Sequence, residues 1–162
     1  MPRTRGLAHV NLHVSDIDKS VRFYREVFGL EFLAEGTATT ESAGQPLELR
    51  QAMLSTPGCE DLLALTHSAS TSLPLGNAGV NHIGFNFESD EDVRTAVDVI
   101  PRYGGKVVRE GEREQGGLRE IFVYAEDPDG YIIEMSTQRG ILALKKARQQ
   151  KAPCSESSTN VL

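Results

Sequence analysis

The strongest constraint on this chain is a short pattern that it contains twice. Residues 9–16 read HVNLHVSD, and residues 82–89 read HIGFNFES. Each copy begins with a histidine and then places an apolar residue at every second position, which is typical of a strand with one buried face. Because the two copies lie 73 residues apart, the sequence predicts one supersecondary unit that is written twice.

A helix is expected after each of these strands, which are predicted over residues 7–14 and 80–87. In the first half, Ser15 and Asp16 offer an N-cap, apolar residues follow at helical spacing, and Gly29 supplies a stop. The second half repeats these signals after residue 89, and Pro101 is expected to end or kink that helix.

Three further strands are predicted behind each helix. They fall at residues 30–35, 47–54 and 62–67 in the first half, and at 106–109, 120–125 and 131–136 in the second. A polar stretch rich in Gly and Thr, residues 36–44, is interpreted as a loop, with a lid as one role for it, and DPDG at 127–130 predicts a tight turn. The fold class is therefore α+β: two paired βαβββ modules that form a cup-shaped mixed β-sheet around a central cavity.

The domain boundaries follow from changes in composition. We expect a first module at 1–67, a linker rich in Ser, Gly and Pro at 68–79, and a second module at 80–138. Residues 139–151 carry basic residues and no acidic ones, which predicts a short basic helix, and residues 152–162 are predicted to be disordered.

The overall composition of the chain limits the classes of partner that it can bind. The chain has 162 residues and a net charge of −6, so it repels phosphate backbones, and nucleic acid is not expected as a partner. No apolar segment has the length of a signal peptide core or a membrane span. Two cysteines, distant in sequence, match no metal or redox spacing. These features predict a cytoplasmic protein that acts on a small molecule.

Three polar side chains interrupt apolar strands at matching places. Strand alternation turns His9 and His82 away from the apolar face, and Glu134 lies inside the apolar strand YIIEMS. A single strand histidine is usually a hydrogen-bonded core residue, and a single strand glutamate usually pairs with an arginine. Two histidines and one carboxylate that meet with open positions instead form a site for Fe(II), Mn or Zn. Because all three stand at matching places of a duplicated unit, the sequence favours one divalent metal.

Four other polar residues are weaker candidates for a role in the site. His13 and His67 are interpreted as strand-end histidines, with support of the metal ligands as the alternative for His13. Glu48 is the nearest candidate for a general base, and Gln51 for orienting a substrate, although both residue types are more often solvated on an outer strand.

The segments HVNLHVSDIDKSVRFYREVFGLEF, NHIGFNFES and DPDGYIIEM resemble the vicinal oxygen chelate superfamily, also called the glyoxalase, bleomycin-resistance and dioxygenase superfamily. The resemblance covers residues 6 to about 137. It implies paired βαβββ modules that form a cup around a divalent metal, commonly in homodimers. It also places metal ligands at the heads of the first strands and in the fourth strands, where His9, His82 and Glu134 stand.

The fourth ligand position separates the branches of the family. Alignment of DLLALT with YIIEMS puts Ala64 opposite Glu134, where glyoxalase I enzymes carry a glutamate that transfers protons. The resemblance therefore argues against ordinary lactoylglutathione lyase activity. A His, His, Glu set is similar to that of extradiol-type Fe(II) dioxygenases and of fosfomycin-resistance enzymes with Mn(II).

Each of these two branches has a match and a mismatch. Tyr124 matches the dioxygenase tyrosine that hydrogen-bonds the substrate oxygen, but Asp61 replaces the acid–base histidine. VNHIGFNFES and the predicted C-terminal basic helix are similar to those of the fosfomycin-resistance enzymes, but the arginine expected nine residues after the last glutamate falls at Ala143.

The resulting hypothesis is a homodimeric enzyme with one divalent metal, Fe(II) favoured and Mn(II) or Zn(II) as alternatives. His9, His82 and Glu134 are the expected ligands, and Tyr124 is the expected catalytic residue that hydrogen-bonds an oxyanion. The favoured reaction is dioxygenase-like ring or C–C cleavage. The alternatives are a Mn or Zn lyase, isomerase or epoxide-opening enzyme, and a metal-free protein that sequesters a drug.

Overall fold

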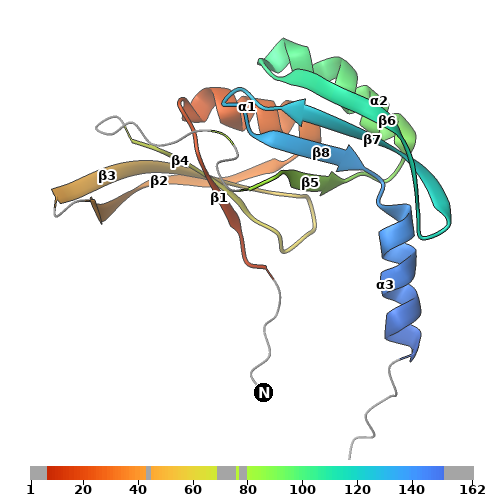
Figure 1. Cartoon of the computed structure of the whole chain (residues 1–162). Coiled ribbons are helices and arrows are strands. Elements are labelled where there is room, and N and C mark those ends of the chain that lie inside the picture. Colours follow the sequence, from red (N-terminus) through yellow and green to blue (C-terminus); the bar gives the residue numbers. More distant parts are fainter. Residues whose placement is uncertain (1–6, 43–44, 69–75, 77–79, 152–162) are drawn as a thin grey trace, which may run out of the picture.

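The computed structural model describes residues 7–42, 45–68, 76 and 80–151. In these residues the chain forms two four-stranded sheets with two helices packed over one side (Figure 1). The strand orders are β1-β4-β3-β2 and β5-β8-β7-β6, so the second sheet repeats the first. The predicted α+β fold built from two βαβββ units is confirmed. Most of the predicted linker 68–79 and all of the predicted tail 152–162 lie outside the described residues.

The first unit follows the predicted order of elements. Its elements are β1 (Val10–His13), α1 (Ile17–Phe28), β2 (Glu31–Ser42), β3 (Gln45–Ser55) and β4 (Leu63–His67). Asp16 caps α1, since its carboxylate accepts a hydrogen bond from the Lys19 N–H at 3.0 Å. Gly29 ends the helix in the left-handed region with φ of 67°.

The second unit repeats this order. Its elements are β5 (Ile83–Asn86), α2 (Asp90–Val99), the 3₁₀ helix η1 (Ile100–Tyr103), β6 (Lys106–Gln115), β7 (Leu118–Glu126) and β8 (Ile132–Ser136). Because Pro101 cannot donate a helical hydrogen bond, α2 ends at Val99 and the chain tightens into η1, as predicted. A last helix, α3 (Arg139–Lys151), projects away from the sheets (Figure 1). No helix among the described residues is long and apolar enough to cross a membrane.

The loop predicted over residues 36–44 is wrong. Residues 36–42 continue β2 and pair antiparallel with β3, which begins at Gln45. Likewise, β6 extends to Gln115, beyond the predicted end at residue 109. Threonine has high strand propensity, and a paired hairpin satisfies its backbone hydrogen bonds without a buried face. Alternation of apolar residues therefore underestimated the lengths of β2 and β6, the two strands that extend beyond the core.

The two sheets of the predicted cup do not join into a closed barrel within the described residues. The two sheets share no strand pairing, and each ends in an edge strand, β1 or β5. A cleft of about 370 Å³ between the sheets is bordered by residues of both edges, among them Val10 and Ile83. Each sheet therefore presents its own open face.

The two units are joined through α1. Phe28 of α1 stacks on Phe85 of β5, with ring centroids 4.3 Å apart. The buried Tyr24 hydroxyl donates a hydrogen bond of 2.9 Å to Asp127 in the DPDG turn. Beside it, the Tyr131 hydroxyl donates to the His13 carbonyl oxygen at 2.9 Å. An aromatic stack and a buried polar cluster thus fix how the second sheet sits against the first unit.

The Asp127 carboxylate is the titratable centre of this cluster. Burial raises the pKa of Asp127, while hydrogen bonds from the Tyr131 N–H, the Tyr24 hydroxyl and the Asp129 N–H oppose that rise. Burial, together with the Asp127 charge, also raises the pKa of Tyr24 well above its usual value. Tyr24 therefore stays protonated and serves as a donor.

We predict that Tyr24→Phe lowers the free energy of unfolding by about 1.5–3 kcal/mol at neutral pH, because one oxygen of a buried carboxylate loses its donor. The loss also raises the folded-state pKa of Asp127 further. The deficit therefore shrinks as the pH falls through that pKa and the carboxyl becomes neutral. Urea denaturation at several pH values measures this dependence.

Tyr103→Phe is the matched control, because the Tyr103 hydroxyl lies 3.5 Å from exposed Glu26 and its loss costs under about 0.5 kcal/mol. A pH-independent deficit in Tyr24→Phe would contradict the assigned role of the hydrogen bond.

Candidate metal centre

A row of side chains crosses the open face of the second sheet. Arg109 of β6 pairs in register with Tyr124 of β7, which pairs with Glu134 of β8, which pairs with Gly84 of β5. Residues directly opposite one another on neighbouring strands point to the same face. Three polar side chains from three strands therefore lie side by side, turned away from the helices.

Glu134 and His82 form the centre of this face. The Glu134 side chain is only 5% exposed, and its Oε2 lies 2.8 Å from His82 Nε2. The other ring nitrogen of His82, Nδ1, lies 2.7 Å from the Asn81 side-chain oxygen. Because that oxygen only accepts, Nδ1 carries a proton, and Nε2 is the nitrogen directed at the carboxylate.

This pair fits a divalent metal. A histidine ligand usually donates its second N–H to an oxygen that fixes the ring, as Asn81 does here. Nitrogen and oxygen ligands that share one metal at about 2.1 Å lie about 3.0 Å apart in octahedral and about 3.4 Å apart in tetrahedral geometry, so the observed 2.8 Å fits the octahedral arrangement better. One further ligand from the chain would complete the expected set.

Tyr124 borders the pair. Its hydroxyl lies 3.3 Å from Glu134 Oε2, and its ring meets the His82 ring edge-on, with centroids 5.3 Å apart. Burial raises the pKa of Tyr124, and the charge of Glu134 and the hydrogen bond to it raise it further. The hydroxyl therefore stays protonated and can donate to an oxygen at this place.

Arg113 contacts two buried carboxylates at once. Its Nε donates to Glu120 Oε1 at 2.8 Å, and its Nη1 lies 2.5 Å from Glu134 Oε1. Burial lowers the pKa of Arg113, but the hydrogen bond to Glu120 and the negative charges of Glu134 and Glu120 outweigh this and raise it, so the guanidinium stays charged. The contact with Glu134 is not aligned as a hydrogen bond, and Glu134 Oε1 has no hydrogen-bond donor. Arg113 thus forms an ion pair with Glu134 but does not supply the hydrogen bond that Oε1 lacks.

The charges of this cluster do not balance. One guanidinium stands against two carboxylates that are 2% and 5% exposed, those of Glu120 and Glu134. Burial of an uncompensated charge is costly. The open side of Glu134, where His82 Nε2 lies 2.8 Å from Oε2, is therefore the place at which a bound cation would balance the charge.

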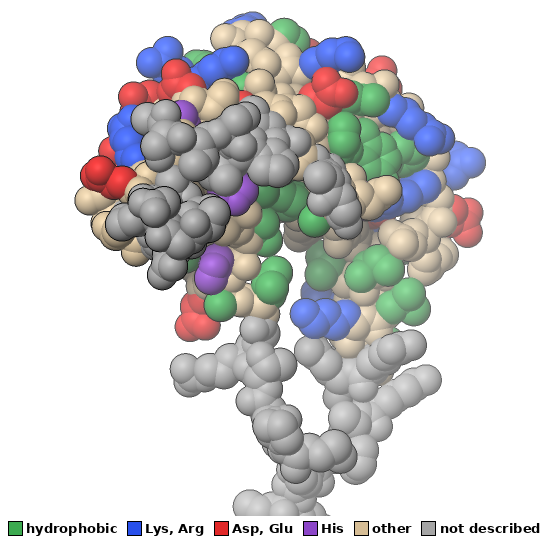
Figure 2. Space-filling model, turned by 60° about the vertical axis from the view of Figure 1, so that its left-hand side comes forward, with side chains coloured by type: hydrophobic (Ala, Val, Ile, Leu, Met, Phe, Trp, Pro, Cys, Tyr) green, Lys and Arg blue, Asp and Glu red, His purple; other side chains and the backbone are tan. Residues whose placement is uncertain are grey.

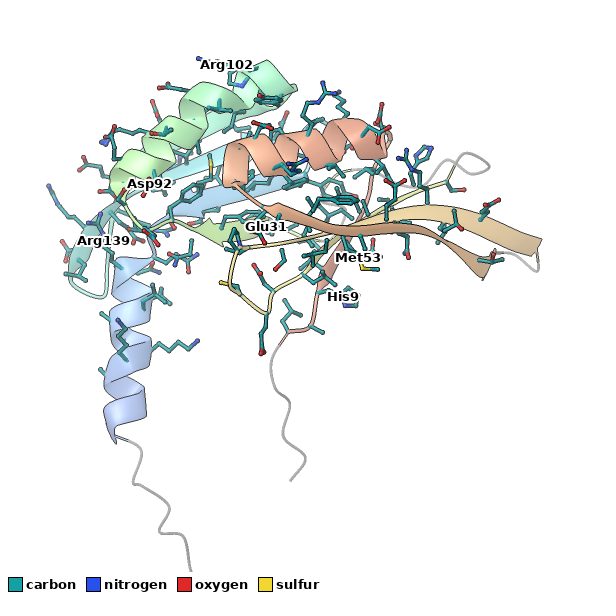
Figure 3. The ribbon with its side chains drawn as sticks, turned by 180° about the vertical axis from the view of Figure 1, so that it is seen from behind. His9, Glu31, Met53, Asp92, Arg102 and Arg139 are labelled. Carbon is teal, nitrogen blue, oxygen red and sulfur yellow. The ribbon has the colours of Figure 1, made fainter. Side chains whose placement is uncertain are left out.

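Glu120 anchors the following helix. It accepts the Arg139 N–H at 2.8 Å and the Thr137 hydroxyl at 3.3 Å, just where α3 begins. The Arg139 side chain in turn reaches Asp90 at the start of α2, at 2.5 Å (Figure 3). Glu120 is therefore structural, and Arg113 links it to Glu134.

His9, the third predicted ligand, lies apart from this pair. Its side chain is exposed and points away from α1 beneath the first sheet (Figure 3). Histidine and hydrophobic side chains are exposed together on one face of the molecule (Figure 2). Within the described residues of one chain, no three side chains of the metal-binding types come together. The structure thus brings His82 and Glu134 together and leaves His9 outside.

The first sheet carries the matching row with different chemistry. There Ala34 pairs with Met53, Met53 with Ala64, and Ala64 with Asn11. Ala64 occupies the place that Glu134 has in the second sheet, in agreement with the alignment of the two repeats. The same backbone therefore forms with no charged side chain in this row.

The weaker candidates have structural partners. His67 Nδ1 contacts the Val14 carbonyl oxygen at 2.9 Å, and Gln51 donates to Thr66 at 3.3 Å. Asp61 accepts the Thr56 N–H at 2.9 Å and so caps the turn before β4. His13 Nδ1 is buried without a hydrogen-bond partner, and Glu48 is exposed.

Sequence reasoning missed both Arg109 and Arg113, because the predicted strand ended at residue 109. The alternation Arg109, Gly111, Arg113 was the signal that could have placed them on one face.

The family model for the Glyoxalase/Bleomycin resistance protein/Dioxygenase superfamily matches residues 6–135. The chain belongs to this superfamily. A probable lactoylglutathione lyase from Synechocystis sp. is 35% identical over 135 residues, which cover 80% of this chain and 92% of the relative. A lactoylglutathione lyase from Neisseria meningitidis is 34% identical over 134 residues, 79% of this chain and 87% of the relative. A glyoxalase family protein from Bacillus cereus has the same fold, with a TM-score of 0.68, 19% identity and coverage of 83% and 95%.

These relatives bear on the predicted reaction. Both relatives are named lactoylglutathione lyases, one of them as probable, so they support the glyoxalase-like part of the prediction and give no support to an iron dioxygenase. Ala64 nevertheless separates this chain from a mechanism that needs a carboxylate in both sheets.

We predict that Arg113→Met lowers the free energy of unfolding by about 3–5 kcal/mol, because it leaves two buried carboxylates without their shared cation. Arg119→Met is the matched control on β7, where the side chain is 82% exposed and its loss costs under about 0.5 kcal/mol. Chemical denaturation at neutral pH measures both. Equal stability of the two variants would show that Arg113 does not balance the buried pair.

Proposed function

We propose that this protein is a divalent-metal enzyme that acts on a small substrate able to chelate the metal through two neighbouring oxygens. The observation that carries the proposal is the buried Glu134 carboxylate, which faces His82 Nε2 at 2.8 Å and lacks a full set of donors. His82, Glu134 and His9 would hold the metal, and the metal would supply Lewis-acid chemistry.

The third ligand is proposed to come from a second copy of the chain. His9 stands at the head of β1, the place equivalent to His82 at the head of β5, yet it is separate from the pair within one chain. Two copies that place the first sheet of one against the second sheet of the other would add His9 to His82 and Glu134. The proposed active form is thus a homodimer.

The residues of this chain have distinct proposed roles. The protonated Tyr124 hydroxyl donates to the substrate oxygen that gains negative charge. Arg113 holds Oε1 of Glu134, which leaves Oε2 beside His82 for the metal. Ala64 contributes no base, so any proton transfer uses one carboxylate or a group of the substrate.

A lyase or isomerase reaction is the proposed chemistry, supported by the lyase relatives. The second candidate is oxygen-dependent ring or C–C cleavage with Fe(II), favoured by the donor set and by the position of Tyr124 next to Glu134. The identity of the native metal separates the two. Iron directs the assay to O2 uptake with catechols, and manganese or zinc to lyase, isomerase and epoxide-opening assays.

We predict about one metal ion per chain by elemental mass spectrometry of the full-length protein purified without a tag or chelator. His82→Ala and His9→Ala should each lose most of it, because each removes one of three ligands. Circular dichroism of the variants checks that they fold. Absence of metal, and of uptake on reconstitution, would refute the metalloenzyme and favour a drug-sequestering protein.

Mixed dimers test whether His9 of one chain completes the metal site of the other. In a dimer of one His9→Ala chain and one His82→Ala chain, one of the two shared sites has all its ligands. We therefore expect that unfolding and refolding the two variants together restores metal to about one quarter of the chains, as random pairing requires. No recovery above the separate variants would show that each site is built within one chain.

A further inference from the structure

The row across the second sheet contains one cation, Arg109, that has no ion-pair partner among the described residues. Arg109 is exposed on β6 and, among the described residues, has no carboxylate within ion-pair distance. Arg113, four residues on, is fully engaged by Glu120, Glu134 and Ser136. The two arginines on this face therefore differ. Arg113 has a structural role, and Arg109 has no ion-pair partner among the described residues.

Both arginines lie over the Phe122 ring, and the guanidinium carbon of Arg113 is 5.7 Å from its centroid, but for Arg109 this ring contact is the one that fixes its position. The guanidinium carbon of Arg109 lies 5.5 Å from the centroid of the Phe122 ring, and the Phe122 and Tyr124 rings meet edge-on at 5.7 Å. The far end of the Phe122 ring lies over Gly111 of β6, since a Cβ at Gly111 would come within 3.0 Å of the ring. A guanidinium stacked on a ring keeps its N–H edge available for an anion.

A bulge in β6 aims Arg109 at this face. The register shifts between Val107 and Arg109, so Val108 has no partner and Arg109 comes opposite Tyr124. The first sheet has the same bulge between Phe32 and Ala34, and there the re-aimed residue is Ala34. The bulge thus forms without an arginine, and the fold does not need a cation at this place.

We propose that Arg109 is an anion-recognition residue of the site, and that the substrate carries a carboxylate, phosphate or phosphonate besides its two chelating oxygens. This inference rests on the proposed metal site at Glu134. Arg109 lies one strand beyond Tyr124 and two beyond Glu134, so the acid group of the substrate would sit about 5–10 Å from the metal along the sheet. Phe122 forms the floor beneath it.

Two hydroxamates that chelate through the same pair of oxygens make the test sharp. Succinic acid monohydroxamate carries a free carboxylate, and its amide of equal length is neutral. Both are titrated into the full-length protein loaded with Co²⁺, whose visible spectrum reports chelation. We expect the acid to bind about tenfold more tightly than the amide, because a charged hydrogen-bonded pair is worth about that much at a partly exposed site.

The preference is expected to vanish in Arg109→Met, to persist in part in Arg109→Lys, and to remain whole in Arg119→Met, the exposed arginine of the opposite face. The amide should bind all four proteins alike. Chelation without a preference for the acid, or a preference that survives Arg109→Met, would overturn the anion role and leave the metal site intact. No spectral change with either compound would refute the proposed function together with it.

Discussion

The guanidinium of Arg113 is the interaction on which the second sheet depends. It lies between Glu120, which fixes the start of α3, and Glu134, the only carboxylate in the described part of the transverse row. A carboxylate this deep in a sheet forms only if positive charge is near it. Arg113 makes a buried Glu134 possible but leaves the charge balance incomplete, and that imbalance is the physical basis of the proposed metal site.

The repeat provides an internal control for this conclusion. Both sheets keep their apolar face toward the helices, and that face makes the fold. On the open face, the first sheet places Ala34, Met53 and Ala64 where the second places Arg109, Tyr124 and Glu134. Since the same topology forms with either set, the polar set of the second sheet is an addition to the fold. Differences between repeats thus separate candidate chemistry from architecture without any second protein.

The sequence predicted the strands whose apolar and polar residues alternate and the helices whose ends carry a capping residue or a proline. The strand pair at residues 9–16 and 82–89, the caps at Asp16 and Ser89, and the end of α2 before Pro101 all follow from local physical chemistry. The paired extensions of β2 and β6 were missed, because their side chains lack an apolar face and only pairing with a neighbour reveals them.

The same limit applies to the site. Glu134 and His82 stand out because they are polar in apolar strands, and the structure brings them within 2.8 Å. Arg113 belongs to a strand extension, so its place beside Glu134 depended on a register that alternation alone cannot give. His9 matches His82 in the repeat, but the distance between them is set by how the modules pack, which no local pattern encodes.

That packing supports the proposal that a second copy of the chain supplies His9. Phe28 stacked on Phe85, and Tyr24 bonded to buried Asp127, fix α1 against the second unit. Rotation of one sheet toward the other to bring His9 to His82 would break both contacts and expose an aromatic core. A second chain can supply the missing first sheet without that cost, since each sheet already presents an open face. Metal binding and dimer formation would then be linked equilibria, each stabilising the other.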